Sequence, residues 1–280
     1  MIIEPSGQAC GAVVRGIDLS QLSSDGTIAN IRSAWLKHRV LAFADQQMDD
    51  DALERFTLLM GEFGEDPFFN PIPGRQNIAA ITREADETSP LFAESWHSDW
   101  SFLPAPPSGT CLLAVEIPPK GGDTLFSDQA AAFAALPAAR KEELRKLTAV
   151  HSASRGYAPD GLYGENDKGR SMDIRPDEAA RAKQAHPLVK RHRETGEEVL
   201  FCSISYTVGI EGMSDADAMQ LVMELHHWCE QDQFVYRHQW QPGMLVMWDN
   251  RSVNHRATDG YEGHRRGTAP DHDRSITIAI

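Results

Sequence analysis

Residues 96–100, with the sequence WHSDW, place an imidazole and a carboxylate two positions apart. In a strand, residues i and i+2 point to the same face, so His97 and Asp99 can present their side chains to one ion. A second histidine from elsewhere would complete a set of two histidines and one carboxylate, and His255 is the best candidate. Such a triad leaves three adjacent positions on iron(II) open for a bidentate co-substrate and O₂. The pair alone also fits a half-buried histidine bonded to a nearby aspartate.

These residues need a framework that brings distant segments together. The sequence predicts short strands along the whole chain, with helices inserted near its start and middle. The strands are expected at 40–43, 78–81, 111–115, 124–126, 244–248 and 274–280. The helices are expected around 28–36, after the acidic residues 49–51, between 129 and 150 with a break near Pro137, and after Ser214. Residues 64–96 and 151–200 are rich in turn-forming residues and are predicted to be long loops. Because no βαβ units recur, the pattern favours one mainly β domain, residues 1–280, with inserted helices.

Longer motifs surround the candidate ligands. Residues 96–102 read WHSDWSF, residues 116–126 read EIPPKGGDTLF, and residues 248–266 read WDNRSVNHRATDGYEGHRR. With GAVVRGIDL at 11–19 and GEFG at 61–64, they resemble the taurine dioxygenase and 2,4-dichlorophenoxyacetate dioxygenase family over nearly the whole chain. The resemblance implies a double-stranded β-helix, a jelly-roll core, that holds iron at one mouth.

The resemblance also implies the roles of individual residues. His97, Asp99 and His255 match the Fe(II) ligands of the family. Thr124 matches the hydroxyl that binds the distal carboxylate of 2-oxoglutarate, and Arg266 matches the arginine that pairs with it. A planar guanidinium grips a carboxylate with two hydrogen bonds and a hydroxyl adds one donor, so these residue types suit a dicarboxylate.

The implied activity is that of an Fe(II)- and 2-oxoglutarate-dependent dioxygenase. It consumes O₂ and 2-oxoglutarate, releases succinate and CO₂, and hydroxylates a small organic substrate that is expected to be anionic. When the hydroxylated carbon carries a heteroatom, a C–O or C–S bond then breaks. Related halogenases lack the carboxylate ligand, so Asp99 favours hydroxylation.

The C-terminal segment departs from the family. Members carry a second arginine four residues after the first, which binds the anionic end of the substrate, whereas this chain has Pro270 there. In one interpretation Arg266 holds 2-oxoglutarate and Arg274 is a displaced substrate arginine, or no such arginine exists. In the other, a short insertion shifts the register and Arg274 holds 2-oxoglutarate. We favour Arg266, because the stretch GYEGHRR keeps the spacing of the family.

Other conspicuous residues have simpler interpretations. In a strand, Trp96 and Trp100 would point away from the candidate ligands, which favours core packing over a place in the substrate pocket unless the strand ends before Trp100. Residues 68–70 are expected to line the substrate site, as the resemblance implies. They belong to the predicted loop at 64–96, and a loop of that length is often a lid over a reactive site. His226 and His227 lie on a predicted amphipathic helix and are expected at its surface or boundary.

The composition limits the partners. Counts of 27 Lys and Arg against 41 Asp and Glu give a formal net charge of −14, which disfavours nucleic acid and membrane partners. The four cysteines form no CxxC pair, which argues against a metal ribbon, an iron–sulfur cluster or a disulfide framework, and fits the cytoplasm. No stretch has the pattern of a signal peptide or a membrane span. The family resemblance makes a homo-oligomer plausible.

Two other functions are compatible with these residues. A zinc hydrolase can use two histidines and one carboxylate, but hydrolysis does not need the carboxylate clamp of Thr124 and Arg266. A β-barrel binding or sensing protein that has lost turnover would share the same fold.

Overall fold

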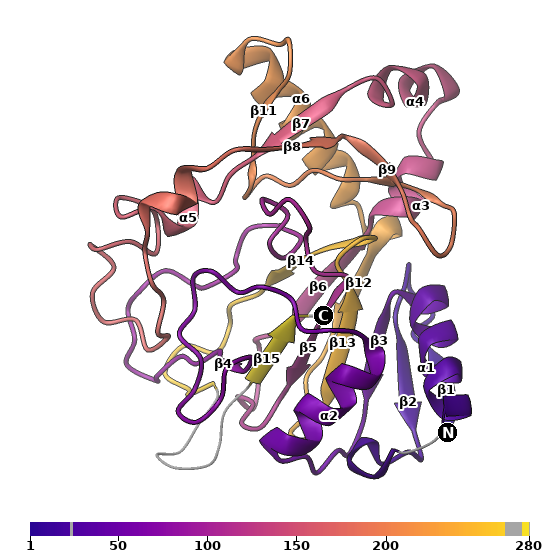
Figure 1. Cartoon of the computed structure of the whole chain (residues 1–280), viewed down its shortest axis with the longest axis vertical. Coiled ribbons are helices and arrows are strands. Elements are labelled where there is room, and N and C mark those ends of the chain that lie inside the picture. Colours follow the sequence, from indigo (N-terminus) through magenta and orange to yellow (C-terminus); the bar gives the residue numbers. More distant parts are fainter. Residues whose placement is uncertain (23–24, 267–275, 280) are drawn as a thin grey trace.

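The computed structural model describes residues 1–22, 25–266 and 276–279, and two facing sheets form its core (Figure 1). The larger sheet has seven strands, in the order β1 (Ile2–Pro5), β2 (Ala12–Arg15), β3 (Val40–Phe43), β13 (Leu245–Asp249), β5 (Gly109–Leu113), β15 (Ile276–Ala279) and β4 (Ala79–Ala80). The smaller sheet has the order β12 (Val235–His238), β6 (Thr124–Asp128) and β14 (Val253–Ala257). Neighbouring strands are antiparallel in both sheets, apart from the parallel pair β2 and β3.

Both faces of the larger sheet are covered. On β13, Val246 and Trp248 lie in the apolar cluster between the two sheets, together with Phe126 of β6. Leu245 and Met247 alternate with them and belong to the cluster on the opposite face. A strand buried on both faces has a continuous apolar sequence, which is why 40–43 and 244–248 could be recognised as strands from the sequence.

Helices α1 (Asp25–His38) and α2 (Asp50–Met60), with the short η1 (Leu19–Gln21), lie against the outer face of the larger sheet (Figure 1). The helix α2 begins where the acidic residues predicted it, because the side chain of Asp49 accepts a hydrogen bond from the backbone N–H of Ala52 at 2.7 Å. Its Phe56 is fully buried, with its ring centroid 5.8 Å from that of Phe43 on β3. Burying a side chain of this size contributes about 1.5–3 kcal/mol to folding, so α2 is anchored mainly by its apolar face.

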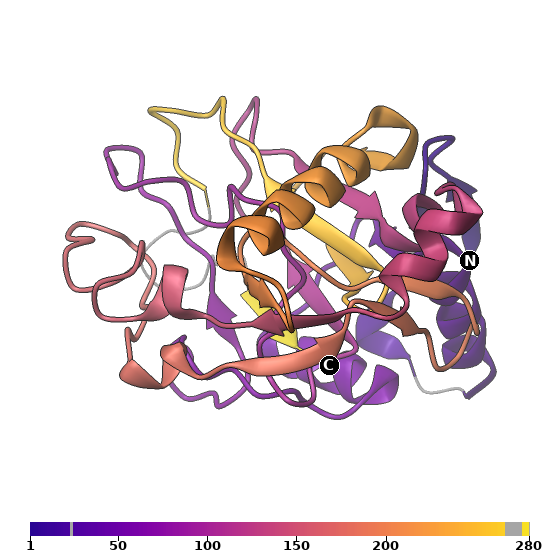
Figure 2. The same ribbon diagram turned by 90° about the horizontal axis from the view of Figure 1, so that it is seen from above.

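The segment between β6 and β12 forms an outer layer of the molecule. It contains the three-stranded sheet β11 (Thr207–Ile210), β7 (Thr148–His151) and β8 (Gln184–Pro187), and the pair β9 (Val189–Arg191) and β10 (Glu198–Leu200). Its helices are α3 (Gln129–Ala134), α4 (Ala138–Leu144), α5 (Ser154–Tyr157), η2 (Glu178–Arg181), α6 (Asp215–Cys229) and η3 (Asp232–Phe234). Figure 1 shows α6 and β7 at the opposite end of the molecule from α1 and α2, and Figure 2 views the molecule from that end.

Some predicted elements are confirmed and others are wrong. Ser214 caps α6 as expected, and the helical stretch after residue 129 breaks at Pro137. Residues 148–151, however, form β7 and not the end of a helix. The prediction of one long loop at 151–200 is also wrong, because β8, β9 and β10 lie there. These strands have only three or four residues each and carry many polar side chains, so they give little periodic signal.

The predicted C-terminal strand is confirmed as β15, which pairs with β5 in the larger sheet. Pro270 and Arg274 lie outside the described residues. Among the helices of the described residues, none is both long enough and apolar enough to cross a lipid bilayer.

Candidate active site

His97 and His255 are brought together by the backbone. His97 forms an isolated antiparallel bridge with His255 on the edge strand β14, with N–H···O distances of 3.0 and 2.7 Å in the two directions. Their ring centroids are 4.2 Å apart. The Nε2 atoms of His97 and His255 lie 3.5 and 3.6 Å from Oδ1 of Asp99. Two imidazole nitrogens and one carboxylate oxygen from buried residues therefore converge on one point.

The local geometry differs from the predicted strand. The pairing stops after His97, and a turn begins at Asp99 and continues through Trp100. Trp100 has a φ of 49°, in the left-handed region that bulky residues rarely adopt. The alternation of a strand does not apply here, so the prediction that Trp100 points away from the ligands is wrong. Trp100 lines the same pocket as His97 and Asp99.

The carboxylate of Asp99 is oriented by two donors that the sequence did not reveal. Thr110 Oγ1 donates to Asp99 Oδ2 at 2.6 Å, and Trp248 Nε1 donates to the same oxygen at 3.2 Å. Oδ1 is left to face the two histidines. Thr110 in turn accepts a hydrogen bond from Asn250 Nδ2 at 2.9 Å. The sequence signal that could have indicated this role is a polar residue in an apolar strand. In the structure, Thr110 lies directly opposite Trp248 in the register of β5 and β13.

The protonation states of the cluster suit a cation. Burial raises the pKa of Asp99, but the neighbouring His255 and His97 and the bond from Thr110 bring it down to about 2. Burial lowers the pKa of His255 to about 3, so its imidazole is neutral at pH 7. His97 Nδ1 lies 2.8 Å from the carbonyl oxygen of Ser95, so Nδ1 donates to that carbonyl and Nε2 faces the cluster. Neutral imidazoles and an ionised carboxylate are the forms that bind metals.

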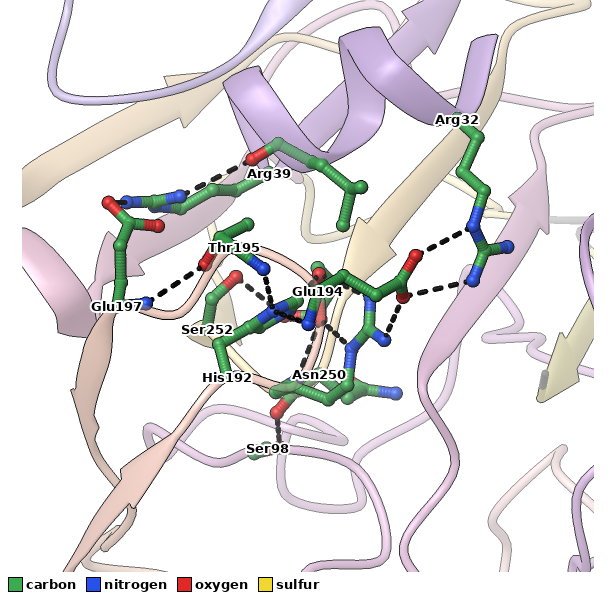
Figure 3. Close-up of polar contacts among 12 residues, drawn as sticks. Arg32, Arg39, Ser98, His192, Glu194, Thr195, Glu197, Asn250 and Ser252 are labelled. Atoms are coloured by element: carbon green, nitrogen blue, oxygen red, sulfur yellow. Dashed lines mark hydrogen bonds and ion pairs between the residues drawn. The ribbon is translucent and has the colours of Figure 1, made fainter. Parts of the chain in front are cut away.

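A polar network surrounds the turn after β13 and includes Ser98, the residue between His97 and Asp99 (Figure 3). Ser98 donates to the backbone carbonyl of Asn250 at 2.6 Å, which ties the residue between the two candidate ligands to the turn after β13. In that turn, the Asp249 carboxylate lies 3.0 Å from Nε2 of His192 and 2.8 Å from the guanidinium of Arg251. Burial opposes ionisation of Asp249, but these two partners outweigh it and lower its pKa. Figure 3 shows His192 beside the turn that carries Glu194.

Arg266 and Thr124 line the same pocket as the metal-binding cluster. Arg266 is buried, and its guanidinium lies 5.9 Å from the ring centroids of both Trp240 and Tyr261. Burial lowers its pKa although Tyr261 opposes this change. Within the described part of the chain, no carboxylate forms an ion pair with Arg266. Thr124 Oγ1 accepts a hydrogen bond from Trp240 Nε1 at 3.0 Å, so its own proton is available to another acceptor.

The remaining predicted residues have different outcomes. Arg274 cannot be compared with Arg266 because it lies outside the described residues. His226 and His227 lie at the end of α6 with Glu230 close by, partly or fully exposed, which confirms their expected place at the helix surface. Phe69 lines the pocket, as expected for the loop at 68–70.

Comparisons with known proteins agree with this geometry. The model of the family described as "Taurine catabolism dioxygenase TauD, TfdA family" matches residues 2–269. The chain is 31% identical to the alpha-ketoglutarate-dependent sulfate ester dioxygenase of Pseudomonas putida, over 99% of this chain and 89% of that protein. It is 32% identical to the alpha-ketoglutarate-dependent 2,4-dichlorophenoxyacetate dioxygenase of Cupriavidus pinatubonensis, over 91% of each.

A solved structure shows the same fold. The crystal structure of AAD-2 in complex with Mn(II) and N-oxalylglycine superposes with a TM-score of 0.78 and 27% identity, over 100% of this chain and 96% of that one. The predicted fold class, a mainly β protein with inserted helices and a jelly-roll core, is thereby confirmed. The chain belongs to the TauD/TfdA family of dioxygenases.

Proposed function

We propose that residues 1–280 act as one Fe(II)- and 2-oxoglutarate-dependent dioxygenase domain that oxidises a small organic anion with O₂. One observation carries the proposal. Two imidazole nitrogens and a carboxylate oxygen converge in a pocket that also contains a buried arginine without a carboxylate partner among the described residues. His97, Asp99 and His255 would hold the metal, and Thr124 and Arg266 would hold 2-oxoglutarate.

The donor set fits this metal and this co-substrate. Two histidines and one carboxylate on adjacent positions form the ligand set of non-haem Fe(II) oxygenases. An isolated guanidinium is costly to bury unless an anion pairs with it, so the surroundings of Arg266 call for a carboxylate from a ligand. The relative solved with Mn(II) and N-oxalylglycine supports this view, because that compound differs from 2-oxoglutarate by one NH in place of a CH₂.

Each residue has a defined task in this proposal. O₂ is the oxidant, and Fe(II) with 2-oxoglutarate bound at this site would activate it, so that one oxygen atom enters succinate as CO₂ is released and the other enters the substrate. The two histidines would bind the metal through Nε2, and Asp99 would bind it through Oδ1. Thr110 and Trp248 hold the second oxygen of Asp99, which keeps that carboxylate in a single orientation. Arg266 and Thr124 orient the co-substrate from its far end.

The relatives support an anionic substrate and bond cleavage after hydroxylation. Two of the relatives are named for anionic compounds, one for sulfate esters and the other for 2,4-dichlorophenoxyacetate. Hydroxylation beside the ester or ether oxygen of such compounds gives an unstable product in which the C–O bond breaks. The alternative of a metal hydrolase leaves the buried Arg266 without a task, and nothing in the pocket favours it.

Cellular context is part of the proposal. The four cysteines are buried free thiols, which supports a reducing compartment such as the cytoplasm. The net charge of −14 supports small molecules over nucleic acid or membrane surfaces as partners. Assembly into a homo-oligomer rests on the family resemblance alone.

The test is anaerobic addition of Fe(II) and then 2-oxoglutarate to the metal-free protein, followed by visible absorption. Chelation of iron by the keto acid gives a weak charge-transfer band, which we expect in the wild type and not in His255→Ala. His97→Ala and Asp99→Ala are expected to lose iron-dependent succinate formation. Wild-type activity in either variant would rule out these three residues as the metal ligands. Tight iron binding without the charge-transfer band would rule out the proposed 2-oxoglutarate site.

A further inference from the structure

The C-terminal end of α6 carries a second group of side chains of the types that bind metals. His226, His227 and Glu230 offer two imidazole nitrogens and one carboxylate oxygen, and these atoms lie within 4.8 Å of one another. We call these three residues the α6 triad. Within the residues that the structure describes, the triad and the metal-binding cluster of the pocket are the two groups that bring three such ligand atoms together.

The spacing of the triad explains how one helix end brings its side chains together. Residues four positions apart lie on the same face of a helix, so Glu230 lies one turn beyond His226. His227 follows His226 directly, and their ring centroids are 5.3 Å apart at an interplanar angle of 43°. Neighbouring residues of a helix are about 100° apart around its axis, so the two rings must lean toward each other to come this close.

The separation of the ligand atoms matches the size of a tetrahedral metal site. Zn(II) binds imidazole nitrogen and carboxylate oxygen at about 2.0–2.2 Å, so two of its tetrahedral ligands lie about 3.3–3.6 Å apart. His226 Nε2 and Glu230 Oε2 are 3.5 Å apart, which is long for a hydrogen bond and suitable for two atoms that share an ion. His227 would supply the third ligand and water the fourth.

The imidazoles of the triad are free to bind. Burial lowers the pKa of His226, and the neighbouring His227 and Arg256 lower it further, although Glu230 opposes them. His226 is therefore neutral in most molecules at pH 7 and keeps the lone pair that a metal requires. In the described part of the chain, no hydrogen bond to the protein uses a ring nitrogen of either histidine, and Glu230 is the one acidic partner of His226.

The charges around the triad favour a cation, with one exception. The C-terminal end of α6, a helix of 15 residues, carries partial negative charge on its last carbonyls, and Glu230 adds a full negative charge. Arg256 opposes a cation, because it is close enough to lower the pKa of His226. We therefore expect an ion that exchanges with solvent and that a chelator removes easily.

The triad lies apart from the proposed iron site. His226 and Glu230 line a small hollow together with Asn254 of β14. Asn254 directly precedes His255, and neighbouring residues of a strand point to opposite faces. An ion at the triad would therefore lie on the other side of β14 and share no ligand with the iron.

We propose that the α6 triad is a second, peripheral binding site for a divalent transition metal such as Zn(II). The proposal goes beyond the dioxygenase function and does not depend on it. Two imidazoles and a carboxylate favour Zn(II) or Cu(II) over Mg(II) and Ca(II), which prefer oxygen ligands alone. Because all three ligands come from the end of α6, a bound ion stabilises that helix end and does not join distant segments.

Equilibrium dialysis of the untagged, intact protein against buffered Zn(II), followed by elemental analysis, tests this proposal. The double variant His97→Ala/His255→Ala removes the proposed iron site, and His226→Ala removes the triad. The wild type is expected to bind two equivalents of Zn(II), the double variant and His226→Ala one each, and the combination of all three changes none. If His226→Ala binds as much Zn(II) as the wild type, the proposal is overturned. A single wild-type equivalent that persists in the double variant and disappears in His226→Ala would support the triad and count against the proposed iron site alone.

Two further variants separate the triad from surface histidines in general. Glu230→Gln keeps the size of the side chain and is expected to weaken this Zn(II) site at least about tenfold, since loss of even an outer partner of a ligand costs about 10- to 100-fold. His38→Ala is the matched control, because His38 also lies half-buried in the last turn of a helix, α1, but belongs to neither group of candidate ligands. A loss of Zn(II) in His38→Ala equal to that in His226→Ala would show unspecific binding and refute the site. If His226→Ala does not fold, Glu230→Gln decides.

Discussion

Replacing Thr110 with valine keeps the shape of the side chain and removes the hydroxyl that orients Asp99. The lost bond is 2.6 Å long and ends on a buried carboxylate. A hydrogen bond to a charged group contributes about 1.5–3 kcal/mol, and 1.4 kcal/mol corresponds to a factor of ten. The bond from Trp248 remains, so the loss of orientation is partial. We therefore expect iron(II) affinity to fall about 10- to 100-fold, the range usual for residues that orient a metal ligand.

The assay is anaerobic competition for iron(II) between the protein and a colorimetric chelator of known affinity. Thr110→Ser keeps the hydroxyl and is expected to bind iron nearly as the wild type does. Thr57→Val is the matched control, since Thr57 is also buried and its hydroxyl donates to the carbonyl of Leu53 at 2.8 Å, within α2. Both valine variants lose buried hydrogen bonds, and Thr110→Val also loses the one that Thr110 accepts from Asn250, so both are expected to lose some stability, but only Thr110→Val should lose iron affinity. Iron affinity within twofold of wild type in a folded Thr110→Val protein would refute the role of Thr110.

Three further predictions concern cofactor binding, stability and reactivity. Arg266→Ala is expected to raise the KM for 2-oxoglutarate at least about tenfold while Arg274→Ala leaves it unchanged, and steady-state kinetics showing the reverse would assign the co-substrate to Arg274. Asp249→Asn is expected to lower the free energy of unfolding by about 3–5 kcal/mol at pH 7, because it breaks a buried charge pair. The pKa of Asp249 is lowered in the folded protein, so its contribution is present above the unfolded value of about 4 and is lost as pH falls through the lower folded value. Urea unfolding of wild type and variant should therefore converge in acid, and a gap that stays constant would contradict this assignment. Burial raises the pKa of the Cys111 and Cys202 thiols to about 12, so Ellman's reagent at pH 8 should react with them only after unfolding, and rapid labelling of the native protein would show that they are accessible.

The sequence revealed those parts of the fold that have a strong local signal. The strand at 40–43 was recognisable because four apolar residues stand together, and α2 because Asp49 precedes an amphipathic run. The short polar strands β8 and β9 carry no such signal, because pairing with neighbours and not side-chain pattern determines them. Local pattern therefore predicted the buried core well and the outer layer poorly.

The candidate site shows the same division. His97 and Asp99 were recognisable as a pair because their types and spacing suit a metal, and His255 because of the motif around it. Thr110 was not, since only the register between β5 and β13 places it beside the carboxylate. The direction of Trp100 was predicted wrongly because a left-handed backbone conformation at a tryptophan leaves no trace in the residue pattern.

The backbone bridge between His97 and His255 has a consequence for how metal binding and folding are related. Two imidazoles from segments that lie far apart in the sequence are positioned by main-chain hydrogen bonds of the chain itself. Bringing the two histidine side chains together costs conformational entropy, and the chain has already lost this entropy when it folds and forms the sheet. In small zinc domains the reverse holds, and the chain unfolds when the metal is removed. Here the metal-free chain should keep its fold, so the ligand residues can change in evolution without endangering the scaffold that positions them.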